Sequence, residues 1–131
     1  MDIALWIAQA VLALIFAVSG VFKATHSKDE LVASGQTGVK LYKLGFIRFI
    51  AICELLGMIG VIVPWLTGIG RVFTPVAAVG LGVIMIGAAV SHSRLASQEF
   101  MRRRQELLNV GTTLAILSAC VFVAVGRFNM L

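Results

Sequence analysis

The residues of this sequence that could do chemistry lie inside or beside long apolar runs. Glu54 is in the middle of FIRFIAICELLGMIG (46–60), and Lys23 and His92 stand at the ends of two other runs. A carboxylate inside a membrane costs ~3 kcal/mol on insertion scales, so it needs a partner or a proton. Lys23 or His92 could pair with it, and a Glu–His pair could move a proton near neutral pH. Glu54 and His92 are therefore the candidate catalytic residues, although a buried ion pair could equally pin helices together.

Two uncharged groups extend this candidate site. Ser19 lies one helical turn deeper than Lys23, and His92 and Asn109 border the connection between the last two apolar runs. The predicted ligand-binding set is Ser19, Lys23, Glu54, His92 and Asn109. Alternatives stay open, because Ser19 and Asn109 could hydrogen-bond between helices, and Lys23 and His92 could extend to the membrane interface.

Four further residues are expected at membrane interfaces. Arg48 begins the second run and is predicted to contact lipid headgroups, and Arg127 is predicted to anchor the opposite interface. Trp6 and Trp65 fall at the same end as Arg127, as an aromatic belt would place them.

The elements that must position these residues are four apolar runs. The chain has 131 residues, of which 60% are hydrophobic and 13% charged, too few polar residues to cover a soluble domain of this length. A membrane crossing takes roughly 20 helical residues, and the runs cover about 3–22, 46–63, 72–90 and 107–125. Only Asp2 precedes the first run, which is therefore expected to be a helix and not a cleaved signal. The sequence predicts an all-α, antiparallel four-helix membrane bundle, one domain over 1–131.

The placement of basic residues predicts the orientation of this bundle. Nine lysines and arginines fall at the end formed by the 23–45 and 91–106 connections, and two fall at the other end. By the positive-inside rule both connections are cytoplasmic and both termini outside. The basic residues flank apolar runs, so lipid headgroups explain them better than nucleic acid.

The two basic connections carry signals for short helices. Ser27 and Glu30 form a capping box, which predicts a surface helix over 28–34. SRLASQEFMRRRQ (93–105) reads as a basic surface helix or, equally, a solvated loop, and the second span could begin as early as Val39.

The two cysteines predict no metal or disulfide chemistry. Cys53 and Cys120 lie inside apolar runs and form no CxxC pair, so both are expected to be small core residues and no metal site is predicted.

Short motifs at helix centres and ends resemble a known family. VSGVFK (18–23), FIRFIAICELLGMIGVIVP (46–64), the third run ending at His92 and GRF (126–128) resemble the DoxX-like family. The resemblance covers nearly the whole chain. It implies a small four-helix bacterial protein of the inner membrane, related to a subunit of a thiosulfate:quinone oxidoreductase. Because fold carries over better than activity, this likeness leaves the function open.

Two functions are carried forward from these observations. In the first, the chain is an accessory subunit or binder of a lipophilic ligand such as a quinone. Glu54, Lys23 and His92 then contact its polar head, and a partner protein supplies electrons, since the sequence has no flavin fingerprint or haem histidine pair. In the second, the chain is a non-enzymatic assembly factor or chaperone, the cluster is structural, and helix faces or the basic connection contact a partner protein. For either function, the partner could be a membrane redox protein or a further copy of the chain in a homo-oligomer. A small transporter is a weaker third option, because no internal repeat is visible.

Overall fold

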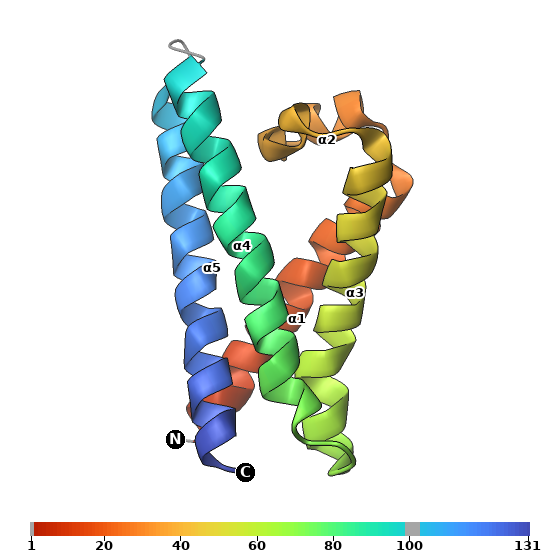
Figure 1. The fold of residues 1–131 in the computed structure, drawn as a ribbon, viewed down its shortest axis with the longest axis vertical. Coiled ribbons are helices and arrows are strands. Elements are labelled where there is room, and N and C mark those ends of the chain that lie inside the picture. Colours follow the sequence, from red (N-terminus) through yellow and green to blue (C-terminus); the bar gives the residue numbers. More distant parts are fainter. Residues whose placement is uncertain (1, 99–102) are drawn as a thin grey trace.

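The computed structural model describes residues 2–98 and 103–131, and this part of the chain is helical with no strand. Its elements are α1 (Asp2–Thr25), α2 (Lys28–Ala33), the 3₁₀-helix η1 (Thr37–Leu41), α3 (Leu44–Thr67), α4 (Phe73–Gln98) and α5 (Arg103–Asn129). The four long helices run antiparallel, with both termini at one end and α2 at the other (Figure 1). The predicted all-α helical bundle is confirmed.

The bundle consists of two helical hairpins. α1 packs along α3, α4 packs along α5, and α3 joins the two pairs by packing on α4. We call the end that carries α2, η1, the last turn of α4 and the first turn of α5 the basic end, and the opposite end the termini end (Figure 1). At the basic end the two hairpins diverge, and α2 with η1 lies above the space between them.

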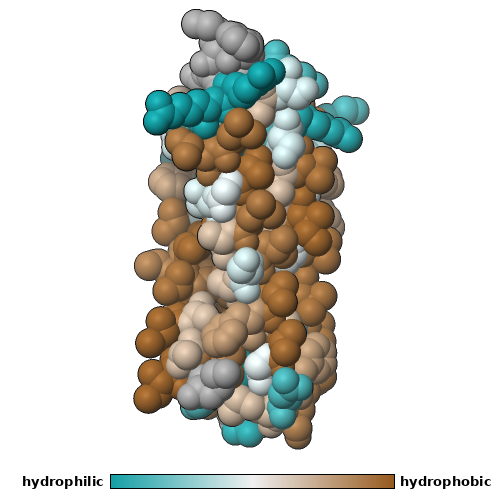
Figure 2. Space-filling model, turned by 90° about the vertical axis from the view of Figure 1, so that its left-hand side faces the viewer, coloured by the Kyte–Doolittle hydropathy of each residue, from teal (hydrophilic) through white to brown (hydrophobic). Residues whose placement is uncertain are grey.

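All four long helices are long and apolar enough to cross a membrane. On the face that Figure 2 shows, apolar side chains cover the middle of the molecule, and hydrophilic side chains gather toward its two ends. Large apolar residues such as Ile3, Leu14 and Leu66 are more than 60% exposed, which a lipid environment accommodates and water does not. The spans predicted over 3–22, 46–63 and 107–125 lie within α1, α3 and α5, and the span predicted over 72–90 begins one residue before α4.

Two expectations about the basic end are corrected. Residues 93–98 continue α4 and residues 103–105 begin α5, so neither part forms a separate surface helix; residues 99–102 of that stretch lie outside the described residues. Val39 belongs to η1, and α3 begins only at Leu44. The bend between η1 and α3 brings the chain back over the bundle, which a continuous helix from Val39 could not do.

The segment from α2 to η1 is held by capping and by a small apolar cluster. The Ser27 side chain accepts from the backbone N–H of Glu30, and the Glu30 carboxylate accepts from that of Ser27, which confirms the predicted capping box. Leu31, Val39 and Ile47 form a buried cluster that fastens this segment to α3. The segment is thereby fixed over the basic end.

Candidate functional site

The Glu54 carboxylate is fully buried between α1 and α3. Lys23 Nζ lies 2.7 Å from Oε1, and the Ser19 hydroxyl donates to Oε2 at 2.9 Å. α1 can approach α3 this closely because Gly20 faces it: a Cβ there would lie 2.8 Å from Leu55 Cγ. Both oxygens of the buried charge are thus satisfied within the hairpin.

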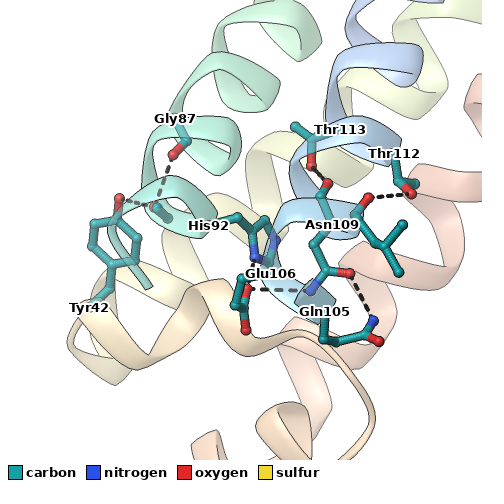
Figure 3. A network of polar contacts seen from close by, with 10 residues as sticks. Tyr42, Gly87, His92, Gln105, Glu106, Asn109, Thr112 and Thr113 are labelled. Carbon is teal, nitrogen blue, oxygen red and sulfur yellow. Dashed lines mark hydrogen bonds and ion pairs between the residues drawn. The ribbon is translucent and has the colours of Figure 1, made fainter. Parts of the chain in front are cut away.

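A second buried carboxylate, Glu106, holds His92 in the other hairpin. His92 Nδ1 lies 2.7 Å from Glu106 Oε2, and the Asn109 side chain donates to the same oxygen at 3.4 Å (Figure 3). His92 therefore does not partner Glu54, which was one of the two predicted pairings. Sequence reasoning missed Glu106 because the fourth run was started one residue after it. Its signal was present, since Glu106, Asn109 and Thr113 follow helical spacing.

The Lys23–Glu54 ion pair and the hydrogen-bonded His92–Glu106 pair border one cavity of about 420 Å³. Its lining is mostly apolar, with contributions from all four long helices and from the segment between α2 and α3. The polar side chains that line it are Ser19, Lys23, Gln36, Tyr42, Ser91, His92, Asn109, Thr112 and Thr113. Four of the five predicted ligand-binding residues therefore meet here. Glu54, the fifth, lies behind Lys23 and Ser19 and does not line the cavity.

The segment around η1 forms the wall of the cavity at the basic end. The Gln36 amide oxygen lies 3.4 Å from the Ser19 hydroxyl, whose one hydrogen is directed to Glu54 Oε2 at the shorter distance of 2.9 Å. Tyr42 donates to the Ser91 hydroxyl at 2.6 Å, because that hydroxyl already donates to the Gly87 carbonyl (Figure 3). The segment thus lies against α1 on one side and is bonded to α4 on the other. Sequence reasoning did not single out Gln36 or Tyr42, since nothing in a loop sequence indicates that it folds back over the bundle.

Arg48 has a different contact from the one predicted. Its Nη1 donates to the backbone carbonyl of Lys23 in the last turn of α1. Carbonyls in the last turn of a helix have no partner within the helix, and a guanidinium there also interacts favourably with the helix dipole. Arg48 therefore ties α3 to the end of α1, close to the Glu54 pair.

The prediction that Arg127 anchors the interface is wrong, because its side chain is fully buried at the termini end. Its Nε donates to Gln9 Oε1 at 2.7 Å, and its Nη1 is paired with Asp2. The guanidinium lies 5.2 Å from the centre of the Trp6 ring and 4.4 Å from that of Trp65. The two tryptophans hold this arginine inside the bundle through cation–π contacts, and Trp65 is itself buried.

The remaining reactive side chains are separate from the cavity. Cys120 is buried in the core and Cys53 is partly buried, and both are free thiols. Within residues 2–98 and 103–131, no three His, Cys, Asp or Glu side chains are placed so that they could hold a metal ion.

Comparison with known proteins identifies the family. A family model described as the DoxX-like family matches residues 7–123, which is most of the chain, so the protein belongs to the DoxX-like family. No curated protein and no solved structure gave a significant match. The four apolar helices and the family together make the chain a multi-pass membrane protein.

Proposed function

Since the chain is a DoxX-like membrane protein, we propose that it binds a lipophilic small molecule of the quinone type inside the bundle, as an accessory component of membrane redox metabolism. The observation that carries this proposal is the cavity between the hairpins. Its volume of about 420 Å³ is within the ~300–1,000 Å³ of small-molecule sites. Protein interiors are ordinarily close-packed, so a space of this size between the hairpins supports a ligand-binding role.

The lining of the cavity suits a ligand with one polar head and an apolar body. Phe16, Ile50 and Ile116 are among the apolar wall residues, whereas Lys23 and His92 bring polar atoms from opposite hairpins. The Lys23 ammonium has three N–H donors, and Glu54 takes the one aimed at it. The other donors are available to a carbonyl oxygen of a quinone head.

The two candidate catalytic residues have different roles in this proposal. His92 lines the cavity and can contact the ligand head directly. Glu54 is a positioning residue: it orients Lys23 and Ser19, through which it would act on the ligand. A bound quinone would supply the redox chemistry, with electrons from a partner protein. Lys23 would donate to one oxygen of the head, and His92 would accept a hydrogen bond, and on oxidation a proton, from the hydroxyl that the other oxygen carries in the reduced form.

A matched pair of variants tests this binding. Ala88 lines the cavity and Ala115 is exposed on the outer face of α5, so Ala88→Leu should fill the cavity and Ala115→Leu should not. In nanodiscs, photo-crosslinking with an azidoquinone should map to cavity residues by mass spectrometry. Ala88→Leu should reduce saturable labelling at least tenfold and Ala115→Leu should leave it unchanged. Equal labelling of both variants, or no saturable labelling of the natural chain, would refute the proposal.

A second candidate, a non-enzymatic assembly factor, is supported by the enclosure of both carboxylates. Glu54 and Glu106 are fully buried; both oxygens of Glu54 are bonded to groups of the same chain, as in a structural cluster, and Glu106 is bonded through Oε2. This role predicts that Glu54→Gln lowers the amount of protein in the membrane while function per molecule stays intact. It also predicts a partner that co-purifies in fixed stoichiometry.

A further inference from the structure

The two ring nitrogens of His92 have different surroundings, because Nδ1 is bonded to Glu106 and Nε2 lies on the other edge of the ring. Its Nδ1 lies 2.7 Å from Glu106 Oε2, and Glu106 is fully buried. When Glu106 is ionised its carboxylate can only accept hydrogen bonds, and Nδ1 then carries the hydrogen. In the neutral ring Nε2 is then a lone-pair acceptor. Glu106 thus sets the hydrogen-bonding character of the other edge of the ring.

That other edge is bordered by Gly38, which also lines the cavity. A Cβ placed on Gly38 would lie 3.5 Å from both Nε2 and Cε1 of His92. Because residue 38 is glycine, it has no side chain that would cover the Nε2 edge of His92. The Gly38 backbone does not have a positive φ, so the glycine is not required by backbone conformation.

The opposite wall has the complementary character. Lys23, on α1, offers only donors, and its ammonium is oriented by Glu54 at 2.7 Å. One hairpin therefore presents a donor to the cavity and the other an acceptor. Each is oriented by a fully buried carboxylate that does not itself line the cavity.

We propose that the cavity selects lipophiles that carry both a hydrogen-bond acceptor and a hydroxyl donor, as in a hydroxyaryl compound with a carbonyl group. The hydroxyl donates to His92 Nε2, and the carbonyl accepts from Lys23. This specificity rests on the proposed ligand-binding function. Glu106 is the positioning residue, since it keeps the acceptor edge of His92 toward the ligand.

Three matched probes separate the two contacts. Nonyl 4-hydroxybenzoate has both groups, nonyl 4-methoxybenzoate lacks the donor, and 4-nonylphenol lacks the carbonyl. In nanodiscs containing the natural chain, the first probe should bind at least tenfold more tightly than either of the others. Equal affinities of the hydroxyl and methoxy probes would overturn the donor–acceptor assignment.

Variants near His92 test the same contact from the protein side. Gly38→Ala places a methyl in ordinary van der Waals contact with the Nε2 edge of His92. It should lower the binding affinity of the hydroxyl probe several-fold without unfolding the chain. Gly45→Ala is its control, since a Cβ there meets nothing within 4 Å. Glu106→Gln should abolish the preference for hydroxyl over methoxy, because an amide can donate to Nδ1 and reverse the tautomer.

The tautomer can be observed directly without a variant of the site. The chain has two histidines, and His26 lies at the end of α1 with its Nδ1 near Thr25. In a His26→Gln background, ¹⁵N NMR of the remaining imidazole should show hydrogen on Nδ1 and none on Nε2. The opposite tautomer would refute the inference even if probes bind. Failure of all three probes to bind would overturn this specificity, and it would refute the ligand-binding function only if azidoquinone labelling is also absent.

Discussion

At the scale of single residues, each buried charge has a partner from another helix or from a neighbouring turn. Glu54 binds Lys23 across α1 and α3, Glu106 binds His92 across α5 and α4, and Arg127 binds Gln9 across α5 and α1. Burying a charge without a partner costs far more than an ordinary hydrogen bond returns. These contacts therefore specify which helices are neighbours as well as stabilising the site.

Removing one charge of the Lys23–Glu54 pair should destabilise the protein. Glu54→Gln leaves the Lys23 ammonium largely buried without a counter-charge, which costs about 3 kcal/mol, the lower end of the range for buried pairs because Lys23 keeps some exposure. The measurement is unfolding of the detergent-solubilised protein. Lys23→Met combined with Glu54→Gln should recover part of the loss. The exposed change Asp29→Asn is the control, and an equally stable Glu54→Gln would contradict this account.

At the scale of elements, close helix packing depends on glycines at particular contacts. Gly57 of α3 faces Leu81 of α4, and a Cβ on Gly57 would lie 2.5 Å from Leu81 Cδ2. Gly80, next to Leu81 in the chain, faces away, with nothing within 4 Å of such a Cβ. Glycine is therefore needed for close helix packing at position 57 and not at position 80.

A pair of alanine substitutions distinguishes these two glycines. Gly57→Ala should lower stability by about 1–3 kcal/mol through overpacking against Leu81. Gly80→Ala should be neutral or stabilising by up to about 1 kcal/mol, since alanine is the better helix former. Thermal unfolding in one detergent would measure both. Equal effects of the two changes would mean that α3 and α4 are not in contact at Gly57.

The short helix α2 should respond to acid. Hydrogen bonds from the Ser27 backbone and side chain hold the pKa of Glu30 below its ordinary value of 4.5. A lowered folded-state pKa contributes stability at pH values above the unfolded pKa, and this contribution is lost as the pH falls through the folded-state pKa. Hydrogen-exchange protection factors for α2, corrected for intrinsic rates, should therefore fall between pH 6 and pH 3.

A glutamine at position 30 provides the control for that pH dependence. Glu30→Gln should remove the loss of protection in this range that Glu30 causes, because the amide does not titrate. Protection in the natural chain that stays constant between pH 6 and pH 3 would show that the capping box does not control α2.

At the scale of the whole molecule, the cavity lies between two hairpins that converge at the termini end and diverge at the basic end (Figure 1). Arg127, Gln9 and the two tryptophans connect α1, α3 and α5 where the hairpins converge. The segment of α2 and η1 spans the hairpins where they diverge, through Gln36 and Tyr42. A ligand would therefore enter the cavity at the basic end or from the side that faces the lipid, and not at the termini end.

The orientation of the bundle in the membrane stays a prediction. Ser34, after α2, is exposed, and Ile69, in the α3–α4 turn, is 80% exposed. With both natural cysteines replaced by serine, Ile69→Cys should react with a membrane-impermeant maleimide in intact bacterial cells, and Ser34→Cys only after lysis. The opposite labelling pattern would reverse the positive-inside assignment.

The sequence by itself determined the four helices and the inward placement of Glu54. Both follow from local quantities, namely the length of each apolar run and the cost of exposing a carboxylate to lipid. His92 and Asn109 could be assigned to the same end of the bundle, because the connection between their helices is short.

Only the tertiary structure decided which groups meet. From the sequence, Lys23, Arg48 and His92 could all have reached Glu54. In the packed bundle, Lys23 pairs with Glu54, Arg48 donates to a backbone carbonyl, and His92 pairs with Glu106. The same packing buried Arg127 and left a cavity where the hairpins diverge. The physical reason is that helix rotation and tilt depend on contacts distant in the chain, which no local pattern records.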